Sequence, residues 1–126
     1  GLSTLESMMT GTPIIAPKTG GLTRQVENFK DMTHNGVALE VDFKTLVGSQ
    51  SVPYIYEDYV QNENFANAMM KIYKMSKKER QALSRKVKSY AEEEFSHQKT
   101  VDSWAESMKS TIKNFKNRKN WQIEEI

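Results

Sequence analysis

Two short stretches near the start of the chain carry residue types that hold phosphate groups and sugar hydroxyls. Residues 1–4 (Gly-Leu-Ser-Thr) precede Leu5 and Met8, which are apolar at helical spacing, and Ser3 and Thr4 are good N-cap residues. Free N–H groups and the dipole at a helix N-terminus attract anions. Glu6 follows in the first turns, where its carboxylate can accept hydrogen bonds from paired sugar hydroxyls. A phosphate site beside an acidic residue for a ribose diol is the usual solution for holding a nucleotide.

The second stretch is the loop of residues 19–22 (Thr-Gly-Gly-Leu). It follows residues 12–17 (Thr-Pro-Ile-Ile-Ala-Pro), an apolar run between prolines that is typical of a buried strand in a parallel sheet. Gly20 and Gly21 let a ligand approach the backbone closely, and ligands of open α/β sheets bind at the carboxyl ends of strands. A glycine pair after a strand is also often a plain turn, so these residues alone leave both interpretations open.

The elements that must position these stretches alternate between helix and strand. Gly11 is expected to end the first helix, a second helix is predicted over about residues 23–29, and a second strand over residues 37–41. This order predicts an α/β fold with a few parallel strands. Residues 43–60 indicate a hairpin or an extended flap, in which Pro53 would confine its strand to an edge.

From residue 62 onward the chain is predicted to be helical. Asn62 is expected to cap one helix, the capping box Ser76–Glu79 opens a second, and Ser96 caps a third. Trp104 is expected to be a core residue of the third helix. The apolar positions of the three helices are Phe65, Met69, Ile72 and Tyr73, then Leu83, Val87, Tyr90 and Ala91, then Val101, Trp104, Met108, Ile112 and Phe115.

The composition of the 126 residues, at most one domain's worth, excludes several classes of site. Cysteine is absent, which excludes disulfide scaffolds, thiolate zinc sites and cysteine nucleophiles. The two histidines, His34 and His97, are too few for a multi-histidine metal site and are both expected at the surface. No apolar run approaches the roughly 20 residues of a membrane-spanning helix, and no signal segment opens the chain. We therefore expect a cytoplasmic protein.

The charges are distributed unevenly along the chain. Residues 1–64 carry four basic and eight acidic side chains, whereas residues 65–126 carry fourteen basic and eight acidic ones. Eight of the basic residues lie between positions 71 and 88, where Glu79 is the only acid. They form either a solvated helix surface or a peripheral contact with an anionic membrane. A nucleic-acid partner is not expected, because no stacking platform of aromatic residues interleaves with the basic ones.

The sequence of residues 1–16, GLSTLESMMTGTPIIA, closely resembles a segment of the retaining GT-B glycosyltransferases. This segment contains the second half of the family's Glu-x7-Glu motif. Residues 19–22 and 26–28 resemble the next loop and helix, and the helices of residues 62–116, with Glu-Phe-Ser at 94–96, resemble the family's C-terminal end. The resemblance covers nearly the whole chain, is most specific at residues 1–22 and is poor at residues 43–60.

The resemblance implies a role for several residues. Glu6 matches the motif's second glutamate, which binds the ribose of the sugar nucleotide. The turn that meets the donor's diphosphate corresponds to Gly1, Leu2, Ser3 and Thr4, and a loop near the donor sugar corresponds to Gly20 and Gly21. The implied donor is a UDP-, ADP- or GDP-sugar, and the acceptor, a glycan, lipid or protein, is left open. Residues 1–61 would be the later half of the nucleotide-sugar domain, a Rossmann-like sheet, and residues 62–126 its C-terminal helices.

The departures from the family pattern imply an incomplete enzyme. The motif's first glutamate would stand three residues upstream of Gly1, so no catalytic residue falls within the chain. The family's diphosphate-binding arginine and lysine and its N-terminal domain would also precede it, and no metal is implied. Arg24 stands where many members have glutamate. Trp104 or Phe115 would pack at the interdomain junction. We expect no transferase activity from the chain alone. The alternative is a non-catalytic helical interaction module whose working part is residues 62–126.

Overall fold

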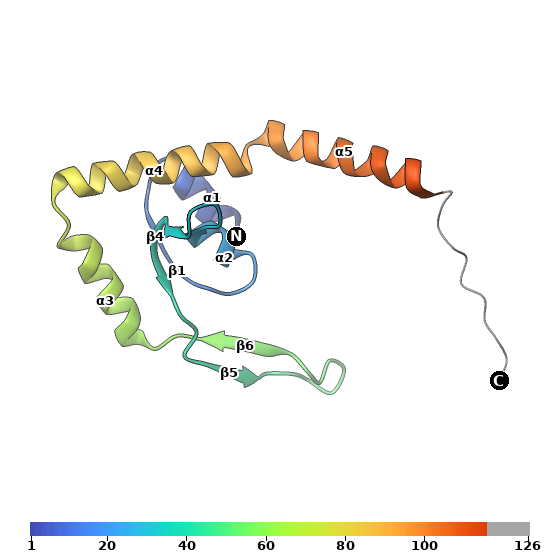
Figure 1. The fold of residues 1–126 in the computed structure, drawn as a ribbon. Coiled ribbons are helices and arrows are strands. Elements are labelled where there is room, and N and C mark those ends of the chain that lie inside the picture. Colours follow the sequence, from blue (N-terminus) through green and yellow to red (C-terminus); the bar gives the residue numbers. More distant parts are fainter. Residues whose placement is uncertain (116–126) are drawn as a thin grey trace.

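The computed structural model describes residues 1–115 and shows a mixed α/β chain with a small parallel sheet followed by helices (Figure 1). Residues 116–126 of the predicted helical region lie outside the described residues. The elements in chain order are α1 (Leu2–Met9), β1 (Ile14–Pro17), α2 (Leu22–Val26), β2 (Glu27–Asn28), β3 (Thr33–His34), β4 (Gly36–Leu39), β5 (Phe43–Leu46), β6 (Tyr56–Tyr59), α3 (Asn62–Tyr73), α4 (Lys77–Phe95) and α5 (His97–Phe115).

Strands β1 and β4 form the predicted parallel pair, with Ile14 opposite Gly36 and Pro17 opposite Leu39. Helices cover both faces of this pair. Ile14 and Ala16 pack in one cluster with residues of α1, α2 and α4, whereas Val37 and Leu39 pack with Ala68 of α3. Because both faces are buried, the strands are apolar runs without alternation, as the sequence indicated.

The start of α1 differs from the prediction. Gly1 is the N-cap residue, and no side chain caps the helix. Ser3 and Thr4 are therefore not caps, because the first turn closes on the Gly1 carbonyl, to which the Leu5 N–H donates at 3.4 Å. Gly11 follows the helix with a φ of +80°, which confirms the predicted stop.

Helix α2 ends at Val26, three residues before the predicted end. The buried side chain of Asn35 donates to the Gln25 carbonyl at 2.9 Å, and the Asn35 N–H donates to the Val26 carbonyl at 2.7 Å. These bonds occupy acceptors that a longer helix would need, so the chain leaves the helix and pairs β2 with β3. The second parallel strand begins at Gly36 and ends at Leu39, earlier than predicted.

The helical region is confirmed, but two of its predicted details are wrong. Gln61, not Asn62, is the N-cap of α3. Met69 and Tyr73 are exposed, because α3 contacts the sheet only through the narrower stripe around Ala68. The capping box of Ser76 and Glu79 is present in α4, whose Val87, Tyr90 and Ala91 are buried as predicted.

Helix α5 begins as predicted but is not part of the core. The Ser96 hydroxyl accepts a hydrogen bond from the Lys99 N–H at 3.3 Å and caps the helix. No residue of α5 is buried, and Trp104 is 64% exposed, so its assignment to the core is wrong. Figure 1 shows the reason: α5 continues past the end of α4, away from the sheet. Its apolar stripe therefore meets no second layer.

Strands β5 and β6 form the predicted hairpin, with Phe43 opposite Tyr59. The two rings stack with centroids 5.4 Å apart. Pro53 lies in the connection between the strands and not in an edge strand, because the turn closes through bonds between Ser49 and Val52. Within residues 1–115, no helix has the length and apolar character needed to cross a membrane.

Candidate functional site

A cavity of about 330 Å³ lies between α1, β1 and the start of α2. On the α1 side it is lined by three hydroxyl residues, Ser3, Thr4 and Ser7. The opposite wall is formed by residues 14–17 of β1 and by Leu22, the residue directly after the glycine pair. Of the predicted site residues, Ser3 and Thr4 line this groove. Gly1, Leu2, Gly20 and Gly21 do not line it, although Leu22, directly after the glycine pair, does.

The N-terminus of α1 leaves backbone donors open at this groove. The N–H groups of residues 2–4 have no carbonyl partner within the helix, as in the first turn of any α-helix, and no side chain caps them. Their partial positive charge and the hydroxyls of Ser3 and Thr4 suit the oxygens of a phosphate.

The glycine loop is open to solvent beside the same groove. Gly20 has a φ of +47°, a conformation that side chains disfavour, and a β-carbon on Gly20 or Gly21 would meet nothing within 4 Å. The loop closes through a bond of 3.0 Å from the Leu22 N–H to the Thr19 carbonyl, while the N–H groups of both glycines have no partner among the described residues. These two donors are available to a ligand.

Glu6 lies on the exposed side of α1 and does not line the cavity. It lies three residues after Ser3, so the two side chains are neighbours on the helix surface. Its carboxylate has no hydrogen-bond or ion-pair partner among residues 1–115. A ligand that filled the groove and extended over α1 would meet this carboxylate at the rim.

The β5–β6 hairpin is tied to the glycine loop. The Thr19 hydroxyl donates to the Asp58 carboxylate of β6, and Lys44 lies 3.5 Å from the other oxygen. The Thr19 bond, supported by Lys44, lowers the pKa of Asp58. The role of residues 43–60 is open from the sequence alone. The structure attaches them to the loop that follows β1.

The cavity follows the edge of β1 that is not paired with β4. The N–H groups of Ile14 and Lys18 bond to the β4 side, at 3.1 and 2.8 Å, so Ile15 presents its backbone to the other edge. Pro13 and Pro17 flank it and have no N–H to offer. This edge is therefore poor in donors, which limits strand-to-strand aggregation.

No charged side chain lines the groove. Lys18, at the end of β1, is engaged by Glu40 at 2.8 Å and by Glu27 at 3.2 Å. These contacts, with Glu40 first, raise the pKa of Lys18. The groove thus offers hydroxyls and backbone donors, and any positive charge for a diphosphate has to come from elsewhere.

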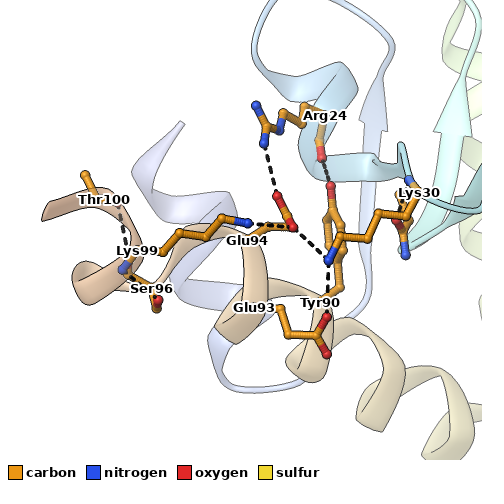
Figure 2. A network of polar contacts seen from close by, with 9 residues as sticks. Arg24, Lys30, Tyr90, Glu93, Glu94, Ser96, Lys99 and Thr100 are labelled. Atoms are coloured by element: carbon orange, nitrogen blue, oxygen red, sulfur yellow. Dashed lines mark hydrogen bonds and ion pairs between the residues drawn. The ribbon is translucent and has the colours of Figure 1, made fainter. Parts of the chain in front are cut away.

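An ionic cluster around the buried Glu94, which the sequence did not predict, lies at the opposite end of α2 (Figure 2). The side chain of Glu94 is 1% exposed and contacts Arg24 at 3.0 Å, Lys30 at 2.8 Å and Lys99 at 2.8 Å. These cations, Lys30 first, lower the pKa of Glu94 to about 2. The Tyr90 hydroxyl, beside this cluster, donates to the Arg24 carbonyl at 2.7 Å.

The cluster has a structural role, since it joins α2, the loop after β2, α4 and α5 (Figure 2). Arg24 is a member of this cluster, and its guanidinium also lies 4.6 Å from the centre of the Phe29 ring. The only sequence signal for a special role of Glu94 was the resemblance at residues 94–96. Three consecutive acidic residues, Glu92–Glu94, otherwise indicate a solvent-exposed helix surface.

Within the described part of the chain, no group of three or more His, Cys, Asp or Glu side chains is arranged to hold a metal ion. His34 is exposed as predicted and lies 3.6 Å from Glu27, and His97 is exposed in the first turn of α5. Comparison with known proteins adds nothing to this description: no family model, no curated protein and no solved structure matches the chain.

Proposed function

We propose that the chain is the C-terminal part of a retaining GT-B glycosyltransferase and that the groove beside β1 holds a nucleotide-diphosphate sugar. The observation that carries this proposal is the single cavity between the uncapped N-terminus of α1 and the residue after the glycine pair. A helix N-terminus without a capping side chain and with two hydroxyls on its first turn suits a diphosphate. The backbone of residues 1–4, with the open N–H groups of residues 2–4, would hold this part of the donor.

The other site residues take the roles that the resemblance implies. Glu6, at the rim of the groove, would accept hydrogen bonds from the ribose hydroxyls. The free N–H groups of Gly20 and Gly21 would meet the donor sugar. During transfer the bond between the sugar and the diphosphate breaks, and negative charge grows on the leaving diphosphate. The donors of α1 would stabilise that charge without reorganisation, which is how this class of reaction is accelerated.

Two features of the structure support an incomplete enzyme. The sheet has two parallel strands with a free edge on β1, and the apolar stripe of α5 is exposed. The groove also lacks a basic side chain, in keeping with diphosphate-binding residues that the resemblance would place upstream. The donor base, the sugar and the acceptor stay open among UDP-, ADP- and GDP-sugars and among glycan, lipid and protein acceptors.

The exposed α5 also favours the second candidate function, a non-catalytic helical interaction module. Its stripe of Val101, Trp104, Met108, Ile112 and Phe115 is unpartnered within residues 1–115. This alternative requires that nucleotide sugars leave the stability of the chain unchanged and that Glu6→Ala has no effect in any assay.

The coding DNA upstream of Gly1 tests whether the motif's first glutamate, which the proposal requires, is encoded there. A reading frame that continues in phase, with a glutamate codon three positions before Gly1, is expected. A stop codon in frame, or a different residue at that position, would contradict the transferase and leave the interaction module as the better account.

The protein expressed with that upstream sequence allows a test of Glu6. We expect Glu6→Gln to raise the KM for the sugar nucleotide about tenfold or more, because hydrogen bonds from hydroxyls to a carboxylate contribute about 1.5–3 kcal/mol each. The matched control is Glu106→Gln, an exposed acid on α5, which should leave the KM unchanged. Equal effects of the two substitutions would contradict the ribose role.

A further inference from the structure

The corner where α3 meets α4 presents apolar side chains to solvent. Met69, Met70 and Tyr73 are 58%, 47% and 74% exposed. Their helical spacing places them on the side of α3 that is turned away from Ala68, which is buried against the sheet. Figure 1 shows α3 and the start of α4 at the opposite end of the molecule from α5.

The same corner carries an uncompensated positive charge. Five exposed basic residues fall within ten positions, and none forms an ion pair with another described residue. Glu79 is the one acid among them, and its carboxylate is occupied by the Ser76 N–H at 2.7 Å. The five are Lys71, Lys74, Lys77, Lys78 and Arg80.

A cavity of about 380 Å³ opens beside this charge, between α3, α4 and the loop after α1. Ile72 and Pro13 form an apolar wall, and Lys77 and Arg80 stand at the same cavity with the polar side chain of Gln81. A phospholipid whose anionic headgroup contacts Lys77 and Arg80 could place an apolar part of the lipid against this wall. The cavity shares no residue with the groove beside β1.

We propose that the α3–α4 corner docks on the surface of a bilayer that contains anionic phospholipids. The negative surface attracts the five basic residues. Each contributes as much binding free energy as a lysine or arginine next to an anionic membrane usually does. Met69, Met70 and Tyr73 enter the interfacial region, where apolar and aromatic side chains are stabilised. Phosphate headgroups contact Lys77 and Arg80.

The apolar side chains favour a membrane over a nucleic acid. Both partners would attract the lysines, but methionine side chains gain nothing from a polynucleotide, and Tyr73 is the one aromatic residue exposed at this corner. Binding to single strands relies on several stacked aromatic residues. A bilayer surface accounts for both kinds of side chain, whereas a nucleic acid accounts for the basic ones alone.

Co-sedimentation of the full chain with vesicles tests the proposal. Vesicles of phosphatidylcholine and phosphatidylserine in equal parts should bind the chain, vesicles of phosphatidylcholine alone should not, and high salt should weaken the binding. The double variant Lys74→Gln/Lys78→Gln should bind about 30-fold more weakly. The matched control Lys109→Gln/Lys113→Gln on α5 removes the same charge and should bind like the unchanged chain.

A second variant separates insertion from charge attraction. Met69→Ser/Tyr73→Ser keeps every lysine and should weaken binding to the mixed vesicles about tenfold, with the helical content unchanged by circular dichroism. Four results would overturn the proposal: no binding to the mixed vesicles, equal binding to both vesicle types, an equal loss in the α5 control, or poly(U) RNA binding as tight as the vesicles with the same dependence on Lys74 and Lys78.

Discussion

Replacement of Glu94 by glutamine is expected to lower the free energy of unfolding by about 2 kcal/mol at neutral pH. The Glu94 carboxylate is buried among three cations, Lys30 first, which lower its pKa from 4.5 to about 2. That difference corresponds to at most about 3.4 kcal/mol of stabilisation. The cations are 43–57% exposed, so water screens them, and the expected loss is smaller.

The stabilisation from Glu94 also depends on pH in a defined direction. The unfolded chain has the ordinary pKa near 4.5 and therefore binds more protons than the folded chain as the pH falls below that value. The contribution is complete above pH 4.5 and is lost as the pH falls to about 2. Because Glu94→Gln cannot ionise, the difference in stability between the unchanged chain and the variant should shrink over this window.

Urea unfolding followed by far-ultraviolet circular dichroism, at neutral pH and at steps down to acid, measures both effects. The matched control is Glu93→Gln: Glu93 also contacts Lys30, at 3.4 Å, but is 59% exposed. It should change the free energy of unfolding by less than about 0.5 kcal/mol. Equal effects of the two substitutions, or a Glu94→Gln loss that does not vary with pH, would refute the buried cluster.

Three further predictions concern the stability of the sheet and the helices. Gly36→Ala should lower the free energy of unfolding, measured by thermal unfolding, by about 3 kcal/mol or more. Gly36 has a φ of +149°, and a β-carbon there would collide with the Ile14 backbone. A variant as stable as the unchanged chain would contradict the β1–β4 register. Ser76→Ala should lower the free energy of unfolding in urea by about 1 kcal/mol, because it removes the capping box of α4. An unchanged midpoint of the urea transition would mean that the box is not formed. Trp104→Ser should change the unfolding free energy by less than about 0.5 kcal/mol, since the ring is exposed, and a loss above about 2 kcal/mol would place it in a packed interface.

The parallel sheet and the capping box could be predicted from the sequence because local patterns determine them. An apolar run between prolines fits a strand that helices cover on both faces, and Ser76 with Glu79 is a self-contained signal. The end of α2 could not be predicted, since it depends on Asn35, which lies nine residues beyond the end of the helix and takes the carbonyl of Gln25.

The candidate site was predicted in composition but not in geometry. Residue types indicated the α1 N-terminus and the glycine loop as candidates, whereas the cavity between α1, β1 and Leu22 exists only through packing of α1 on β1. Helical periodicity placed Trp104 in a core, because periodicity shows an apolar stripe without showing what covers it. The buried Glu94 is paired with Arg24 of α2 and Lys99 of α5. No rule of sequence spacing predicts contacts between these separate helices.

We propose that the groove between α1, β1 and the start of α2 binds a nucleotide-diphosphate sugar. Titration of the isotope-labelled 126-residue chain with UDP-, ADP- and GDP-glucose, followed by amide chemical shifts, tests it most directly. We expect one donor to shift the signals of Ser3, Thr4, Gly20 and Gly21, with a Kd of about 1 mM for one wall of a site. Shifts confined to the lysines of the α3–α4 corner, or no shifts with any donor, would contradict it.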